Sequence, residues 1–235
     1  MIVSINQPAY LPWLGYFHRI ALSDLHVVLD HVQFEKNSFT NRNKVRTKEG
    51  WCWLTVPVKT KGRFGDLAIH KLECADSEDH WTRKHWDTLR FHYARVPYLA
   101  QHAAFFEGVY QKQWLRLNDL LREVTEYLLR AFETTCPLLY SSEMGVEGAK
   151  DELVLNICRA VGATVYLSGP VGRNYLHEDR FREAGIEVVY HDYAHPAYPQ
   201  AHPGFEPFMS AVDLLFNCGP ESRRIMMNDQ EALKR

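Results

Sequence analysis

Two polar clusters near the start of the chain contain the residue types that hold and orient a small molecule. The first is NQPAYLPW at residues 6–13, and the second runs from Gln33 to Lys44. Each follows a short apolar stretch, at residues 2–5 and 25–29. Amide, guanidinium, ammonium and phenol groups bind the oxygen atoms of polyhydroxylated or phosphorylated ligands. The candidate binding residues of the second cluster are Gln33, Asn37, Asn41, Arg42 and Lys44.

Two nearby side chains are candidates for acid–base chemistry. Asp30 directly follows the second apolar stretch, where a carboxylate can hold a hydroxyl or an ammonium group, or accept a proton if burial raises its pKa. His18 lies in an amphipathic run at residues 13–21, and imidazole transfers protons near neutral pH. An ion pair of Asp30 with Arg42 or Lys44, and a purely structural role for His18, are the alternatives.

A third candidate segment is the turn from Ser168 to Tyr175, with the sequence SGPVGRNY. It follows a predicted strand and precedes a helix, and exposed backbone amides in such turns bind anions. Ser168, Gly169 and Tyr175 are therefore candidate ligand contacts. The turn is not a P-loop, because no GK[ST] follows. Its glycines are also explained by the space that a helix entry needs.

Metal and nucleophile chemistry have weaker signals. His191, His195 and His202 are ligand types for zinc, but they lie in a proline-rich segment without regular spacing, so no metal site is predicted. No G-x-S-x-G motif is present, and the five cysteines are scattered without a CxxC pair. Unpaired, scattered cysteines indicate a reduced, cytoplasmic protein.

The elements that must position these groups alternate between strands and helices. Strands are predicted at residues 2–5, 25–29, 51–58, 164–167 and 186–190, with a short edge strand at 69–72. Helices are predicted at residues 13–21, 150–161, 177–184 and 210–216. The alternation predicts an α/β fold, Rossmann-like, with a mostly parallel sheet and helices on both faces. Helical periodicity at about 77–133 predicts a helical insertion between the third and fourth strands of a single domain spanning residues 1–235.

The composition excludes several classes of partner. The 235 residues are 46% hydrophobic and 24% charged, with a formal net charge of −2. The chain has no excess of positive charge that would attract nucleic acid. No apolar run approaches the roughly 20 residues that span a bilayer. Aromatic residues make up 13% of the chain, and such side chains suit carbohydrate and nucleotide faces as well as cores. A small-molecule substrate is therefore expected, without a nucleic acid and without a membrane span.

Ordered blocks of the sequence resemble the WbqC-like proteins. The blocks are INQPAYLPWLGYFHRIALSDLHVVLDHVQFEKNSFTNRNKV, WLTVPVK, GATVYLSGPVGRNYL, YPQ and SAVDLLFNCG, and they run from Ile2 to Gly219. Beside residues already named, the matching positions include Gln7, Tyr10, Tyr16, Tyr198 and Gln200. The resemblance implies an acyl or aminoacyl (glycyl) transferase that acts on an amino sugar or sugar nucleotide, in bacterial gene clusters for O-antigen, lipopolysaccharide and other surface polysaccharides. It assigns positions and no catalytic roles.

Two further hypotheses stay open. The opening topology is similar to nucleotidylyltransferase-like folds such as pantothenate synthetase, which implies an adenylating enzyme that uses ATP. This chain lacks their HxGH motif. The other hypothesis is a non-catalytic module that binds a sugar nucleotide. The sequence leaves open the sugar, the choice between a nucleotide and another activated acyl donor, and assembly into a homo-oligomer.

Overall fold

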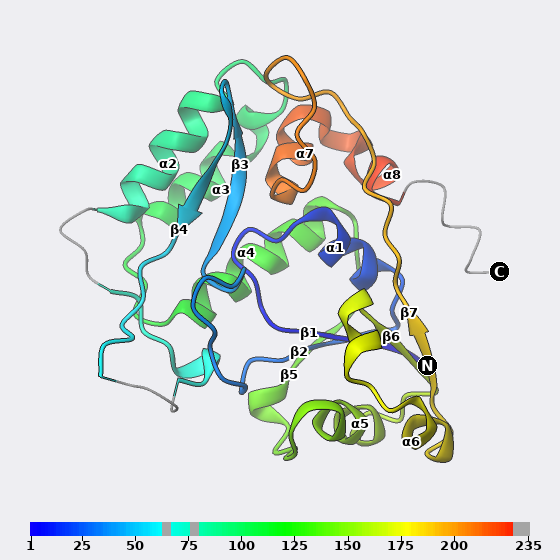
Figure 1. Ribbon diagram of the computed structural model, residues 1–235. Helices are drawn as coiled ribbons and strands as arrows, with labels where there is room; N and C mark the ends of the chain where they lie inside the picture. The colour runs from blue at the N-terminus through cyan, green and yellow to red at the C-terminus, as the bar shows by residue number, and fades with distance from the viewer. Residues whose placement is uncertain (63–66, 76–79, 228–235) are drawn as a thin grey trace.

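A parallel β-sheet forms the centre of the computed structural model, which describes residues 1–62, 67–75 and 80–227 (Figure 1). In this part of the chain the sheet has five strands in the order β5-β2-β1-β6-β7, and every neighbouring pair is parallel. The strands are β1 (Ile2–Asn6), β2 (Leu25–Val28), β5 (Leu138–Tyr140), β6 (Val165–Ser168) and β7 (Glu187–Tyr190). The α/β fold with a mostly parallel sheet is therefore confirmed.

The strand order reverses at the centre of the sheet. Strands β2 and β5 follow β1 on one side, whereas β6 and β7 lie on its other side. The chain consequently leaves the carboxyl ends of β1 and β6 in opposite directions. Open α/β sheets bind ligands in the crevice formed at such a reversal.

Helices cover both faces of the sheet, as Figure 1 shows. Helix α1 (Leu14–Ala21), helix α7 (Ala211–Cys218) and helix α8 (Ser222–Met227) lie on one face, and helices α5 (Lys150–Ala160) and α6 (Glu178–Glu183) on the other. Two hydrophobic clusters match these layers: α1, α4 and α7 contribute to the larger one, and α5 and α6 pack with β1 in the smaller. All eight residues of α1 are buried. A helix buried on every side forces its polar residues to find partners inside the protein.

The described residues between β2 and β5 form a hairpin and three α-helices. Strands β3 (Arg42–Thr47) and β4 (Gly50–Thr55) pair antiparallel outside the main sheet. Helices α2 (Trp81–His92), α3 (Leu99–Gln111) and α4 (Leu117–Ala131) follow. The apolar stripe of α4 is buried, including Leu120, Leu121 and Leu128. The start of the helical segment predicted at Ser77 lies outside the described residues.

Short 3-10 helices complete the fold. They are η1 (Ile69–Lys71), η2 (Ser141–Glu143), η3 (Pro170–Asn174) and η4 (Gly219–Glu221). No helix in the described part of the chain combines the length and apolarity that crossing a membrane requires.

Two strand predictions need correction, and one strand was not predicted. The strand expected at 51–58 exists as β4, but it pairs with β3 in the hairpin and not in the parallel sheet. The third strand of the sheet along the chain is β5, which the sequence showed only as a short apolar run. The edge strand expected at 69–72 is the 3-10 helix η1. The amides of Lys71 and Leu72 donate to the carbonyls of Ala68 and Ile69, three residues earlier, so this part of the segment is helical and not extended.

Candidate functional site

A cleft of about 330 Å³ lies at the carboxyl ends of β1 and β6, where the strand order reverses. Its walls come from β1 with α1, from the turn after β6 and from the segment after β7. The lining residues are Ile5, Asn6, Trp13, Gly15, Tyr16, Arg19, Tyr166, Ser168, Gly169, Pro170, Val171, Gly172, Tyr175 and His191.

The guanidinium of Arg19 is the main charge in this cleft. Arg19 is only 6% exposed, and its Nε atom is buried without a hydrogen-bond partner. No carboxylate in the described part of the chain forms an ion pair with it. Burial lowers the pKa of Arg19, and the phenols of Tyr166 and Tyr16 offset this partly, but an arginine side chain stays charged in proteins. A buried cation without a partner is costly, and a bound anion would supply the missing charge.

The turn after β6 is built around this guanidinium. A Cβ atom on Gly169 would collide with Arg19 Nη1, so the residue must be glycine for the side chain to lie against the turn. Gly169 has φ −70°, so space and not backbone conformation explains the glycine. Ser168 is 1% exposed, and its hydroxyl donates to the carbonyl of Gly169 at 3.1 Å. The turn therefore leaves room for the guanidinium beside Gly169.

Two histidines form a hydrogen-bonded pair beside Arg19. His18 Nδ1 and His191 Nε2 are 2.7 Å apart, and which of them donates depends on the tautomer. Both rings pack on Tyr193, with centroids 4.7 Å and 5.8 Å away. Burial lowers the pKa of His18 to about 4. Burial, together with the nearby His18 and Arg19, lowers the pKa of His191 to about 3. Both imidazoles are therefore neutral at pH 7.

The cleft brings together only part of the predicted site. Tyr16, Ser168, Gly169 and Tyr175 line it, and His18 lies behind His191.

Asp30 lies elsewhere, at the carboxyl ends of β2 and β5. Its carboxylate accepts four hydrogen bonds, at 2.8–3.1 Å, from Ser141, Ser142 and Asn118. The side chain is 0% exposed and bonds to these groups, not to Arg42 or Lys44. Such saturation is typical of a carboxylate that holds two strand ends together; a catalytic role for Asp30 stays a prediction.

The polar residues of the hairpin region also lie outside the cleft. Arg42 stacks over Trp53 and Lys44 over Trp51, on the exposed face of the hairpin. The Asn37 carbonyl accepts from Arg42 Nη2 at 2.6 Å. Asn41 is buried and donates to the Val56 carbonyl at 2.8 Å, and the Gln33 side chain accepts from the Leu67 amide at 3.1 Å.

The remaining predicted binding residues also lie outside the lining of the cleft. The Tyr10 hydroxyl bonds to His85 Nδ1 and to the Tyr110 hydroxyl inside the core, at 2.8 Å and 2.6 Å. Gln200 donates to buried Asp213 at 2.8 Å, and Tyr198 is buried close by. Gln7 is exposed just beyond β1.

The three histidines considered as metal ligands do not converge. His191 bonds to His18, His195 bonds to the carbonyl of Pro196, and the ring of His202 lies against His92. Within residues 1–62, 67–75 and 80–227, no three metal-ligand side chains gather into one group.

Sequence reasoning missed Arg19 and Tyr166, included Asn6 and Trp13 only as ends of the first polar cluster, and considered His191 only as a metal ligand. A signal for Arg19 was present: positions three and four residues away from it hold Gly15, Tyr16, Leu22 and Ser23, so no acidic residue can pair with it along the helix. A cation in an apolar helix without a local partner indicates a ligand contact.

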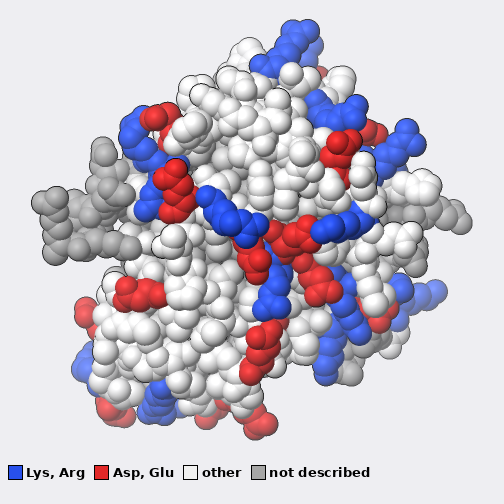
Figure 2. All heavy atoms as spheres, turned by 180° about the vertical axis from the view of Figure 1, so that it is seen from behind, with Lys and Arg blue, Asp and Glu red and all other residues white. Residues whose placement is uncertain are grey.

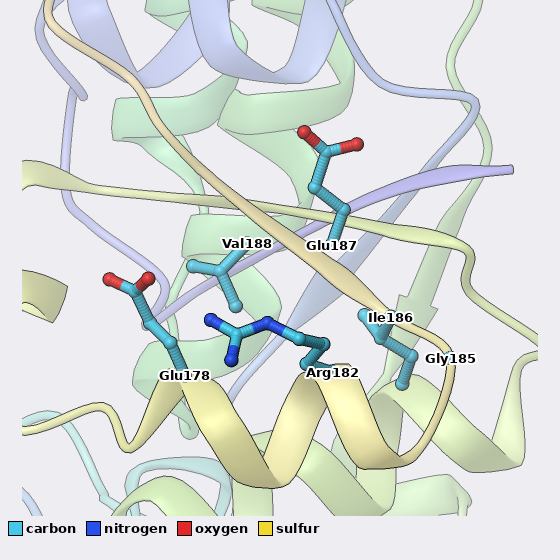
Figure 3. A pocket seen from close by; sticks show the side chains of 6 residues that line it. All are labelled: Glu178, Arg182, Gly185, Ile186, Glu187 and Val188. Carbon is cyan, nitrogen blue, oxygen red and sulfur yellow. The ribbon is translucent and has the colours of Figure 1, made fainter.

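A second hollow, of about 320 Å³, lies between α6 and β7 (Figure 3). Glu178 and Arg182 project from α6, whereas Glu187 on the strand points away from that helix. Glu178 already accepts a hydrogen bond from Tyr190 at 2.7 Å. This hollow is at the edge strand, and none of its lining residues is a buried charged side chain, so the cleft at β1 and β6 is the stronger candidate.

In its described residues, the face of the molecule seen in Figure 2 has no patch of one charge sign that would favour nucleic acid. Figure 2 shows Lys and Arg side chains interleaved with Asp and Glu on the face seen from behind. Exposed ion pairs such as Lys112–Glu123 and Arg122–Glu143 account for part of this mixture.

Comparison with known proteins places the chain in a family. The profile of the WbqC-like protein family matches residues 7–225. The chain is also 36% identical over 222 residues to a protein of Mycobacterium tuberculosis (strain ATCC 25618 / H37Rv) that is named uncharacterized protein Rv1507c, with 94% of this chain and 95% of that protein covered. No solved structure matches the chain. The chain belongs to the WbqC-like protein family.

Proposed function

We propose that this protein transfers an acyl or aminoacyl group, such as glycyl, to the amine of an amino sugar or a sugar nucleotide in the synthesis of a bacterial surface polysaccharide. The observation that carries the proposal is the unpartnered guanidinium of Arg19 in the same cleft as a neutral imidazole pair. Family membership supports the substrate class, since the resemblance described above implies an amino-sugar transferase.

In the proposed reaction the donor is an acyl group activated by a phosphate-containing leaving group. The amine nitrogen of the sugar attacks the carbonyl carbon, a C–N bond forms, and the bond from that carbon to the leaving group breaks. Arg19 holds the anionic leaving group. His191 accepts the proton that the amine loses and returns it to the released phosphate. His191 lines the cleft, and its Nδ1 atom has no hydrogen bond to any described residue.

Binding of the anion also makes His191 a better base. Burial is the main cause of its low pKa of about 3, and the positive charge of Arg19 contributes. A phosphate paired with Arg19 cancels that contribution and adds negative charge beside the ring, so the pKa rises toward its ordinary value. His191 would therefore gain basicity only when the donor is bound. His18 would hold the ring in place and share the proton through the 2.7 Å hydrogen bond.

The shape and lining of the cleft also suit ATP, which would activate the acyl group in the alternative of an adenylating enzyme. Its place at the strand-order reversal and its aromatic walls, Trp13, Tyr16 and Tyr166, suit a nucleotide. An adenylating enzyme would bind ATP or CTP here, which calorimetry measures directly. A module that only binds sugar nucleotides would show affinity for them without any turnover.

Mass spectrometry of reaction mixtures tests the proposal. The protein is incubated with UDP- and TDP-linked amino sugars and with acyl phosphates, including the glycyl adenylate, and the sugar product is expected to gain the acyl mass. His191→Gln is expected to lower kcat at least tenfold, whereas the exposed His177→Gln serves as a matched control and keeps full activity. No mass gain with any donor, or equal rates for the two variants, would refute the proposed reaction.

A further inference from the structure

A strip of aromatic side chains leads from the rim of the cleft to the hairpin. Its six members are Trp13, Phe208, Phe205, Trp51, Trp53 and Phe39. Five of them are exposed, from 37% for Trp53 to 52% for Phe39, although they are large and apolar. Trp13 is partly buried and lines the cleft. Contiguous exposed aromatic residues are unusual on a soluble domain and mark binding surfaces.

Ring contacts connect the members of the strip near the cleft. The centroids of Trp13 and Phe208 are 5.8 Å apart, and His195 lies 5.1 Å from Phe208 and 6.0 Å from Phe205. On the hairpin, Trp51 and Trp53 are 5.6 Å apart and Phe39 is 6.0 Å from Trp53.

The two halves of the strip lie side by side because residues 203–210 run along β3. The amide of Ser210 donates to the carbonyl of Lys44 at 2.8 Å, and Arg46 Nη2 donates to the carbonyl of Pro203 at 2.7 Å. Arg46 pairs directly with Trp51 in the hairpin, so both side chains are on the same face. Figure 1 shows the chain after β7 passing α8 toward α7 and the hairpin.

Two cations lie over tryptophan rings of the hairpin. Arg42 Cζ is 4.4 Å from the Trp53 ring centroid, and Lys44 Nζ is 4.9 Å from that of Trp51. Among the described residues, neither cation forms an ion pair with a carboxylate, and the Nε atom of Arg42 is buried without a hydrogen-bond partner. The hairpin thus presents two exposed tryptophan rings, each with a cation over one face and without a carboxylate that balances the charge among the described residues. Sugar rings pack their C–H faces on aromatic rings, and carboxylates or phosphates on the sugars pair with cations.

We propose that this strip binds an anionic oligosaccharide and leads one end of it into the cleft. The inference rests on the proposed function and extends its acceptor from a single amino sugar to a saccharide chain of several residues. The continuity of the strip with Trp13 in the cleft supports this occupant. A nucleic acid is disfavoured, because the chain has a formal net charge of −2.

Calorimetry with defined sugars tests the strip. Hexagalacturonate is expected to bind the full chain at least tenfold more tightly than monomeric galacturonate or neutral cellohexaose. Trp53→Ala and Arg42→Gln are each expected to weaken hexagalacturonate binding about tenfold, equivalent to about 1.4 kcal/mol. Phe91→Ala is the matched control, since Phe91 is 78% exposed on α2 and outside the strip; its affinity should equal that of the wild type.

Several results would overturn the inference. These are no binding of hexagalacturonate, equal affinity for the hexamer and the monomer, or unchanged affinity in Trp53→Ala. Tighter binding of a twelve-residue oligothymidylate would assign the strip to nucleic acid, and a dimer in sedimentation that Trp53→Ala abolishes would assign it to a second copy of the chain. The outcomes also separate the two proposals. Saccharide binding without turnover supports the strip and not the transferase, whereas turnover of amino sugars with an inert strip supports the reverse.

Discussion

Replacing Arg19 by methionine is expected to stabilise the protein while abolishing anion binding. Methionine keeps an unbranched side chain of similar length and needs no hydrogen-bond partner. The arginine is 6% exposed and has no carboxylate partner among the described residues, so the variant removes the cost of desolvating a charge. That relief is about 2–4 kcal/mol, since exchange of buried ionic groups for apolar ones has effects of this size. Lost packing takes back about 1 kcal/mol.

The net expectation is a gain of about 1–3 kcal/mol in the free energy of unfolding, measured by urea denaturation. For a chain of this size each kcal/mol raises Tm by about 2–4 °C. The same protein samples are then heated with inorganic pyrophosphate. Pyrophosphate should raise the Tm of the wild type, because a ligand that binds only the folded state stabilises it. It should leave the Tm of Arg19→Met unchanged.

Arg173→Met is the matched control for this experiment. Arg173 lies in the turn after β6, which also borders the cleft, but it is exposed and pairs with Asp192 at 2.7 Å and 2.9 Å. Its replacement should leave the urea midpoint nearly unchanged and keep the response to pyrophosphate. The reasoning fails if Arg19→Met destabilises the fold by more than about 1 kcal/mol, or if it still responds to pyrophosphate.

Three further changes have defined expected outcomes. Gly169→Ala should displace the Arg19 guanidinium and weaken pyrophosphate binding about tenfold in calorimetry, with less than about 1 kcal/mol change in stability, and unchanged affinity would contradict the packing argument. Asp30→Asn should cost about 2–4 kcal/mol in urea denaturation, because an amide donor would face the donors around the carboxylate; a stable variant with a lower kcat would instead support catalysis by Asp30. Burial lowers the pKa of His26 to about 3, whereas it is near 6.5 in the unfolded chain, so lowering the pH below about 6.5 protonates the unfolded state first and destabilises the fold. The loss of stability between pH 7 and pH 5 should therefore shrink by about 2 kcal/mol in His26→Asn, and an unchanged loss would refute this assignment.

The main sheet was predictable to the extent that its strands are apolar. Strands β1, β2, β6 and β7 are recognisable in the sequence as short apolar runs, and helix α1 follows β1 as an amphipathic run. Strand β5 has only three residues, too few for a period to show. Strand β3 (RNKVRT) contains mostly polar residues, because its outer face carries cations that stack on the tryptophans of β4. Its pattern makes sense only beside its partner strand.

The candidate site was predictable only where a local motif marks it. The glycine turn after β6 has such a motif, and the structure places it in the cleft. Arg19 belongs to no such motif: the sequence shows only that no acidic residue lies three or four positions away, and the lack of any other ion-pair partner among the described residues is visible only in the folded structure. Asp30 attracted attention by its position after an apolar strand. Its hydrogen-bond partners, Asn118 and Ser142, are 88 and 112 residues away along the chain, so no local pattern shows that they surround it.

The pairing of β1 with both β2 and β6 has a consequence for the order of folding. Residues Val3 and Leu25 can meet early, since 22 residues separate them, whereas Ile2 and Val165 are 163 residues apart. Closing so long a loop is slow and comes after local contacts. During synthesis, Arg19 therefore stays hydrated until the second half of the chain has been made. Its guanidinium loses its water only when that half packs against the first. In refolding, the far-ultraviolet signal of helices and strands should recover before the ability to bind pyrophosphate does.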